Sequence, residues 1–201
     1  MHTFFVHIID ALFPPSDDAR IVRALTEHDI SLLYSSTSVD DVCALSSYKD
    51  RRIRALVHEA KFQKNKRAIS LLSVLFQKHH EKVTFGDHII IPIPLSSRRL
   101  RSRGYNQVHE ILKALPHSSE LNVRTDILKR IKHTSPQTEH ERQTRLKNVR
   151  DAFSVAHVDA IIGKHLILVD DVVTTGATLI AAKIALAKHH PASITCIALA
   201  H

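Results

Sequence analysis

Two adjacent carboxylates are the residues with the clearest chemistry in this sequence. Asp170 and Asp171 end an uninterrupted apolar run at residues 165–169, which is typical of a strand buried on both faces. Ionised acids in such a position require hydrogen-bond donors or a cation, and the vicinal hydroxyl groups of a ribose are suitable donors. We therefore expect Asp170 and Asp171 to hold a sugar and to be the catalytic residues of any reaction at this site.

The residues after the acidic pair have the composition of a phosphate site. A turn at residues 174–178 is expected to lead into a helix, whose first backbone N–H groups attract phosphate. Gly176 permits a tight approach, and the threonines add hydroxyl donors. The combination predicts a ribose 5-phosphate site formed by Asp170, Asp171, Val172, Val173, Thr174, Thr175, Gly176, Ala177 and Thr178. The alternatives are a magnesium-binding acidic pair beside a different phosphate site, and a threonine-capped helix without a ligand.

Two further polar segments follow other predicted strands. The first comes after the apolar run at residues 88–92 and contains Pro94, Leu95, Ser96, Ser97, Arg98 and Arg99. The second extends over residues 129–150 and contains Arg130, Thr134, Gln137, Arg142 and Arg145. A polar segment of this length inside a compact domain is usually a lid or a binding surface. The alternatives are a solvated arginine-rich face for the first segment and an exposed helix at residues 139–147 for the second.

Positive charge is concentrated in the part of the chain that contains these segments. Residues 98–150 contain 13 Lys and Arg against 5 Asp and Glu, an excess equal to the net charge of +8 of all 201 residues. A concentrated positive field attracts polyanions, such as a pyrophosphate, a nucleotide or a nucleic acid. Single-stranded nucleic acid usually stacks on aromatic side chains, and only Tyr105 and Phe153 lie in or beside this window.

Residue spacing excludes several other kinds of site. The four glycines, at positions 86, 104, 163 and 176, fit neither Gly-x-Gly-x-x-Gly nor a Walker-type loop. Cys43 and Cys196 cannot supply four thiolates, and the sixteen histidines form no His-x-x-x-His pair. The apolar stretch at residues 4–13 is too short to cross a bilayer and lacks the features of a secretory signal. A reducing cytoplasm is therefore the expected compartment.

The elements that must position the polar segments alternate between strands and helices. Helices are predicted over residues 17–29, with Ser16 as N-cap, and over 49–62, 66–79, from about 105, and 177–189. Strands are predicted over residues 88–92, 123–128, 152–155 and 165–169, with 194–199 closing the sheet. This alternation predicts an α/β fold with a mainly parallel open sheet flanked by helices. Since ligands bind at the carboxyl ends of such strands, the loops at residues 92–103 and 170–178 should share one crevice.

The acidic pair and the threonine-glycine turn resemble the signature of type I phosphoribosyltransferases. Together with the Pro-Ile-Pro-Leu run at residues 92–95, the Arg-Gly-Tyr-Asn-Gln run at 103–107 and the segment at 134–153, they resemble the competence-associated ComF family, also called GntX-like. The resemblance covers residues 48–201 and implies a type I phosphoribosyltransferase domain with a helical N-terminal hood. Residues 1–47 would be a helical extension without the cysteine pairs of the family's usual zinc ribbon, so no zinc is expected.

The resemblance implies that the site binds phosphoribosyl pyrophosphate with Mg²⁺, which the substrate holds because the sequence has no protein ligand cluster. Residues 94–99 would bind the pyrophosphate, and the segment from Arg130 to Arg145 would close over the substrate. The protein would transfer the phosphoribosyl group, as a pentosyltransferase, to an acceptor chosen by a hood at residues 48–67, with Lys61 as a candidate contact. Two alternatives stay open: a non-catalytic competence protein that binds single-stranded DNA, and a regulator that senses phosphoribosyl pyrophosphate. A homodimer is compatible with each.

Overall fold

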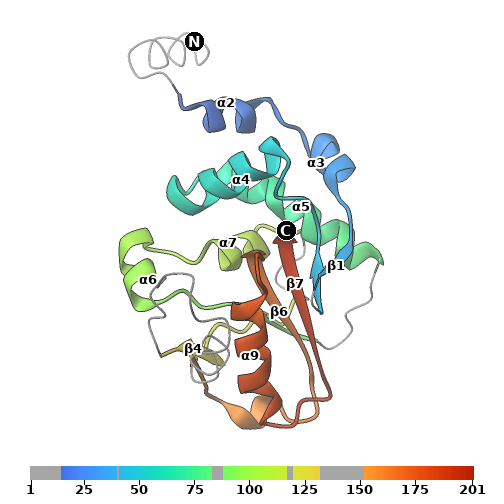
Figure 1. Cartoon of the computed structure of the whole chain (residues 1–201), viewed down its shortest axis with the longest axis vertical. Helices are drawn as coiled ribbons and strands as arrows, with labels where there is room; N and C mark the ends of the chain where they lie inside the picture. The colour runs from blue at the N-terminus through green and yellow to red at the C-terminus, as the bar shows by residue number, and fades with distance from the viewer. Residues whose placement is uncertain (1–14, 40, 83–87, 117–119, 132–151) are drawn as a thin grey trace.

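The structure is a computed structural model, and it describes residues 15–39, 41–82, 88–116, 120–131 and 152–201. Its centre is a five-stranded sheet with the strand order β1-β2-β7-β6-β3 (Figure 1). Strands β2, β7, β6 and β3 run parallel, and β1 pairs antiparallel with β2 at one edge. The predicted mainly parallel α/β fold is confirmed. The five strands are β1 (Thr37–Val39), β2 (Val42–Ala44), β3 (Ile89–Pro92), β6 (His165–Val172) and β7 (Ser193–Ala200).

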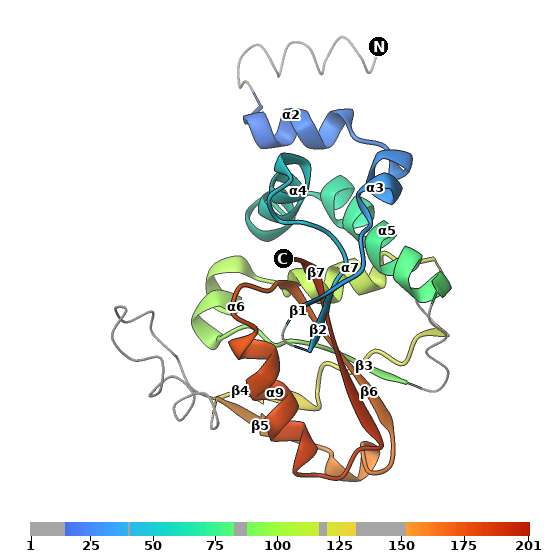
Figure 2. The ribbon, with the colours of Figure 1, turned by 45° about the vertical axis from the view of Figure 1, so that its right-hand side comes forward.

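Helices pack on one face of the sheet and beyond the carboxyl end of β7 (Figure 2). Helices α5 (Lys66–Lys82) and α7 (Gln107–Lys113) contact β7 and β6, and α4 (Arg51–Phe62) packs on α5 and shares their core. Helices α2 (Asp17–Ala24) and α3 (Glu27–Leu33) form an outer layer on α4 and α5. Within the described part of the chain, no helix is both long enough and apolar enough to cross a bilayer.

The other face of the sheet packs against α9 (Ala177–Ala187) and a small antiparallel pair of strands. This pair consists of β4 (Leu128–Arg130) and β5 (Phe153–Val155), which form a sheet of their own. A short 3₁₀ helix, η2 (Val158–Ala160), connects β5 to β6. The central sheet is therefore covered on both faces, as expected for parallel strands.

Strand β6 shows how one segment supplies two cores. Successive side chains of a strand point to opposite faces of the sheet. Leu166 and Leu168 belong to the core on the α9 side, whereas Ile167 and Val169 belong to the core under α4, α5 and α7. All four residues are at most 1% exposed, which explains the uninterrupted apolar run in the sequence.

Capping residues decide where the first helices begin. The side chain of Ser16 accepts a hydrogen bond from a backbone N–H group in the first turn of α2, as predicted. The prediction of one helix over residues 17–29 is wrong, because α2 and α3 divide this range. Thr26 and Asp29 form a reciprocal capping box at the start of α3, a signal that the sequence analysis does not use.

The edges of the sheet differ from the sequence prediction. Strands β1 and β2 are missed, although they lie in the segment 1–47 that is expected to be a helical extension. Because β2 pairs with β7, the sheet crosses the predicted boundary at residue 47, and β7 lies inside the sheet instead of closing it. The predicted strand at residues 123–128 is wrong, since Val123 makes only an isolated bridge to Ile90. Strands of three residues have too little periodicity to be recognised from sequence.

A helix also replaces part of an expected loop. The arginine-rich segment after β3 forms α6 (Ser97–Arg103), which begins after the N-cap Ser96. It ends at Gly104, whose φ of 78° is a left-handed conformation that a Cβ atom disfavours. Arginines in α6 therefore have positions fixed by a helix.

Candidate functional site

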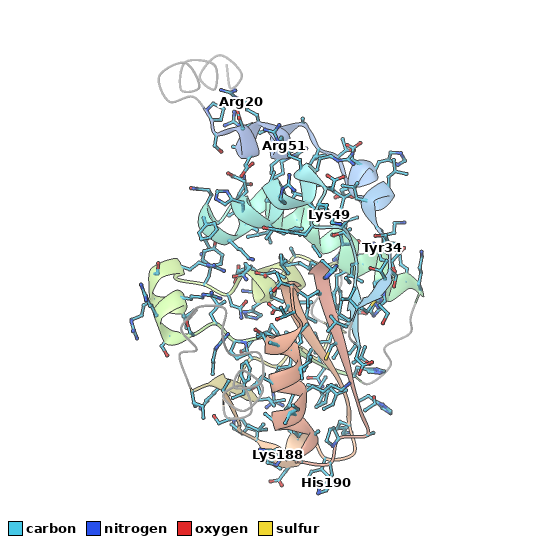
Figure 3. The ribbon with its side chains drawn as sticks, in the orientation of Figure 1. Arg20, Tyr34, Lys49, Arg51, Lys188 and His190 are labelled. Carbon is cyan, nitrogen blue, oxygen red and sulfur yellow. The ribbon has the colours of Figure 1, made fainter. Side chains whose placement is uncertain are left out.

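The carboxyl ends of β3 and β6 open into one cavity of about 990 Å³. Its lining includes residues of α4, α6 and β6 and the start of α9, whereas Lys188 and His190, labelled at the bottom of Figure 3, follow the other end of α9. The structure brings both predicted loops to this cavity, and the predicted residues that line it are Pro94, Leu95, Ser96, Arg98, Arg99, Arg130, Asp170, Asp171, Val172, Thr174 and Thr178. Lys61 and Phe62 of the predicted hood and Arg103 of the predicted arginine-rich loop also line it, together with Gln107, for which no role was predicted.

The turn at residues 174–178 encloses a second hollow of about 50 Å³. Asp170, Val172, Thr174 and Thr178 line both spaces, so the hollow adjoins the cavity. Gly176 has a φ of 67° and is the N-cap of α9, where no side chain accepts a hydrogen bond from the helix. The first N–H groups of a helix have no acceptor within the helix, so this end of α9 suits an anion.

The two carboxylates lie on different faces of β6. The strand continues to Val172 rather than ending before the acidic pair, so the alternation of faces includes Asp170 and Asp171. Asp171 is directed towards α4 and α7 and is only 6% exposed. Asp170 lies on the side of the turn and lines both spaces. The two acids were predicted to act as one unit, but the structure directs them to different faces of β6.

Both oxygens of Asp171 have partners within the protein. Its Oδ1 lies 2.9 Å from Nζ of Lys61 and accepts a hydrogen bond of 2.6 Å from the Val172 N–H group. Its Oδ2 accepts a hydrogen bond from Nε2 of Gln107, whose Oε1 accepts one from Arg103. The side chain of Lys61 is 20% exposed, and the low solvent access strengthens its attraction to Asp171.

Asp170 has a different environment. Its Oδ1 accepts a hydrogen bond of 2.9 Å from the Asp171 N–H group. Burial, followed by the negative charge of Asp171, raises the pKa of Asp170 to about 7, although the positive charges of Lys61 and Arg130 act in the opposite direction. The carboxyl group beside the turn therefore keeps its proton to a higher pH than an ordinary aspartate does.

Tyr105 fixes the end of α4, where Lys61 lies. Its hydroxyl group donates a hydrogen bond of 2.6 Å to the Ala60 carbonyl and accepts one of 3.0 Å from the Lys64 N–H group. The nearby Arg103 of α6 lies over the ring of Phe62 in α4 at 5.3 Å, which adds a contact between these two helices. These contacts fix the end of α4 in a position from which Lys61 reaches Asp171.

Asn106 connects α7 to the loop after β3. Its Oδ1 accepts a hydrogen bond from the Val108 N–H group and caps the helix, and its Nδ2 donates one of 2.9 Å to the Ile93 carbonyl. The cap places Gln107 in the first turn of α7, facing Asp171. Gln107 belongs to a run that was recognised in the sequence, but no role was predicted for it. The signal that could have identified it is a polar residue directly after an N-cap, in a helix turn that is otherwise apolar.

Three arginines of α6 form the opposite wall of the cavity. Arg98, Arg99 and Arg101 line the cavity and are exposed. No described carboxylate lies within ion-pair distance of them. The predicted loop at residues 94–99 is thus half loop and half helix, and its Ser97 is the one member that does not line the cavity.

The third predicted segment is described only at its start. Arg130, in β4, lines the cavity and stacks over the ring of Phe153 at 5.5 Å. Burial and the nearby charge of Arg99 lower the pKa of Arg130. The remaining candidates, Thr134, Gln137, Arg142 and Arg145, lie outside the described residues.

A protein-bound metal cluster does not emerge from the described side chains. Among them, no group of three or more His, Cys, Asp and Glu residues could hold a metal ion. Cys43 and Cys196 are both free thiols on the neighbouring strands β2 and β7. Any divalent cation in the cavity would meet Asp170 and depend on a ligand for its other contacts.

The chain has clear relatives in sequence. Residues 61–201 match the family described as phosphoribosyl transferase domain. The DNA utilization protein YhgH of Escherichia coli O157:H7 is 31% identical over 129 residues, which cover 62% of this chain and 56% of that protein. Competence protein ComFC of Bacillus subtilis is 30% identical over 145 residues (69% and 55%), and Competence protein F of Haemophilus influenzae is 38% identical over 91 residues (45% and 40%). The chain thus spans about half the length of the curated relatives it matches.

Two solved structures show a more distant similarity. The allosteric regulatory enzyme of purine biosynthesis aligns with a TM-score of 0.42 at 14% identity and covers 71% of this chain and 30% of that one. The hypoxanthine phosphoribosyl transferase of Trypanosoma cruzi aligns with a TM-score of 0.37 at 13% identity and covers 68% and 64%.

Proposed function

The chain belongs to the phosphoribosyl transferase domain family, as a ComF-like member, and on that premise we propose that its cavity binds phosphoribosyl pyrophosphate together with Mg²⁺. One observation carries the proposal. A carboxylate, Asp170, borders both the hollow at the start of α9 and a larger cavity whose far wall is rich in arginine. Asp170, the hollow and the arginine-rich wall match, respectively, the hydroxyl groups, the 5-phosphate and the pyrophosphate of such a ligand.

Each part of the ligand has a place in this proposal. The 5-phosphate occupies the hollow at residues 174–178, where backbone N–H groups and the threonine hydroxyl groups donate to it. The ribose hydroxyl groups donate to Asp170. The pyrophosphate extends towards Arg98, Arg99 and Arg101, whose charges offset its own.

Magnesium fits this arrangement without a protein cage. The ion usually keeps one or two carboxylates along with substrate phosphates and water, and Asp170 is a carboxylate that lines the cavity. When bound, it would neutralise negative charge on the leaving pyrophosphate. The chain's own residues orient the sugar and supply positive charge to the same group.

A transfer reaction would break the bond between the anomeric carbon and the pyrophosphate and form one to an acceptor. The α6 arginines would stabilise the charge on the departing pyrophosphate, and Asp170 would stabilise the positive charge that develops on the sugar. The acceptor would approach from the part of the cavity lined by Tyr48, Lys61 and Phe62.

Calorimetry of the purified protein with phosphoribosyl pyrophosphate, with and without Mg²⁺, tests the binding proposal. We expect magnesium-dependent binding that is tighter than binding of ribose 5-phosphate or of pyrophosphate alone. Equal affinity for pyrophosphate alone would contradict it. Release of pyrophosphate across a panel of nitrogen acceptors then distinguishes a transferase from a regulator that binds the ligand without turnover.

A second candidate function is binding of single-stranded DNA. It is favoured by the exposed arginines of α6 and by relatives named for competence and DNA utilization. Phe62, which is 62% exposed beside Arg103, supplies an aromatic face that the sequence analysis did not count. A gel shift with an oligonucleotide, with and without phosphoribosyl pyrophosphate as competitor, shows whether DNA and the sugar ligand use the same cavity.

A further inference from the structure

The neighbouring carboxylates of β6 differ in their side-chain contacts, because Asp171 meets Lys61 and Gln107, whereas Asp170 accepts its hydrogen bond from a backbone N–H group. We propose that the acidic pair is divided in function: Asp171 is a fixed anion that joins the walls of the cavity through Lys61 and Gln107, and Asp170 is the carboxylate that contacts the sugar. Lys61 and Gln107 are then positioning residues. The proposal rests on the function proposed above, and it assigns the two acids different roles within it.

Asp171 has little capacity left for a ligand. Its oxygens already meet the Lys61 ammonium group, the Val172 N–H group and the amide of Gln107. Charge-assisted hydrogen bonds of this kind are the strongest that a carboxylate makes. These three donors leave about one of the four acceptor sites of the carboxylate for a sugar hydroxyl. A second hydroxyl would have to displace a donor, and displacing Lys61 would leave a largely buried ammonium group without its counter-ion.

Asp170 has the opposite character. The hydrogen bond that the described residues give it comes from the Asp171 N–H group alone. The charged groups around it are Asp171 on the same strand, Lys61 on α4 and Arg130 on β4. It borders the hollow at the start of α9, so a sugar whose phosphate lies in that hollow would place its hydroxyl groups beside Asp170.

The network around Asp171 connects four elements. Arg103 in the last turn of α6 donates to Gln107 in the first turn of α7, Gln107 donates to Asp171 on β6, and Lys61 reaches the same carboxylate from α4. The chain of contacts therefore fixes the distance between the arginine wall and the sugar wall. A ligand with charged groups at both ends depends on that distance.

A thermal double-mutant cycle tests the network without any ligand. Asp171→Asn and Lys61→Met should each lower the melting temperature by several degrees, because each leaves a buried partner unpaired. The combined variant should recover at least half of the summed loss, since both charges are removed together. Losses that simply add would overturn the proposal. Lys61→Arg keeps the charge, so its melting temperature should remain close to that of the wild type. This control shows that the effect of Lys61→Met comes from loss of the charge and not from any change at position 61.

Calorimetry with magnesium phosphoribosyl pyrophosphate tests the division of roles. Asp170→Asn should lower affinity more than tenfold without lowering the melting temperature. Lys61→Met should lower affinity severalfold, because the strand that carries Asp170 loses its link to α4, and Lys61→Arg should restore the affinity. A Lys61→Arg variant that binds no better than Lys61→Met, or equal losses for Asp170→Asn and Asp171→Asn with unchanged melting temperatures, would sink it. If the wild type binds no sugar pyrophosphate, the proposed function fails, and the thermal cycle still decides the network.

Discussion

The two walls of the cavity are built in different ways. On the β6 wall, the carboxylates and the turn at residues 174–178 are held by backbone hydrogen bonds and buried partners. On the α6 wall, Arg98, Arg99 and Arg101 are exposed and have no described carboxylate partner. Preorganised groups can select the shape of a ligand, whereas exposed cations attract any polyanion. Under the proposed function, we therefore expect β6 to select the shape of the ligand and α6 to respond to its charge.

Replacement of Asp170 is the strongest test of this difference. Asp170→Asn should weaken magnesium-dependent binding of phosphoribosyl pyrophosphate well over tenfold, because a hydrogen bond to a charged group is worth about 1.5–3 kcal/mol. Binding of inorganic pyrophosphate should stay the same. Calorimetry of both ligands measures the contrast, with Asp159→Asn, an exposed residue outside the cavity, as the matched control. Equal weakening of both ligands would remove the assignment of sugar recognition to β6.

Removal of the α6 arginines should have a smaller and less selective effect. The Arg98→Ala, Arg99→Ala and Arg101→Ala triple variant should lose roughly tenfold in affinity for phosphoribosyl pyrophosphate and pyrophosphate alike at low salt, because each exposed ion pair contributes up to about 1 kcal/mol. If single-stranded DNA binds here, the salt slope of its binding should fall by about 2. Fluorescence anisotropy at several salt concentrations measures both. The control is a triple alanine variant that removes the same amount of charge outside the cavity, at Lys113, Lys164 and Lys188. Its affinities should match those of the wild type.

The pH dependence of ligand binding should also distinguish the β6 wall from the α6 wall. The pKa of Asp170 is raised above its ordinary value to about 7, so its ionised form grows about fivefold between pH 6 and 7. Binding to Asp170 should tighten by that factor, and Asp170→Asn should abolish the change. The unliganded protein should behave in the opposite sense: because the folded state binds the proton more tightly, this group's contribution to stability falls as pH rises from about 4 to 7. Calorimetry and thermal melts across this range check both signs.

The smallest expected effect comes from comparing two glycines, one in the turn beside the phosphate hollow and one at the end of α6. Gly176 and Gly104 both have left-handed backbones, and an added Cβ would meet nothing closer than 3.4 Å at the first and nothing within 4 Å at the second. Alanine at either position should therefore cost a similar amount of stability, about 1–2 kcal/mol. Gly176→Ala should also weaken binding of ribose 5-phosphate a fewfold, whereas Gly104→Ala should not. Thermal melts and calorimetry of the two variants, compared side by side, measure whether the phosphate hollow depends on the turn at residues 174–178.

Long, strongly patterned elements were predictable from the sequence, and short ones were not. Helices α4, α5 and α9 and strands β6 and β7 fall where apolar periodicity places them. Strands β1 and β2 have three residues each, and β2 pairs with β7, a partner some 150 residues away in the sequence, while β1 pairs with β2 at the edge. Helix α6 has no buried residue and thus no apolar stripe; its cap, Ser96, and its end, Gly104, were the available signals.

The residues of the β6 wall could be recognised from the sequence, as an acidic pair after an apolar run, followed by a threonine-glycine turn before a helix. Those features are local, because strand, turn and helix are contiguous. That Asp170 and Asp171 face different neighbours could be seen only in the folded chain. Their division depends on how far β6 continues and on Lys61 and Gln107, which come from helices distant in the sequence and meet Asp171 only through packing.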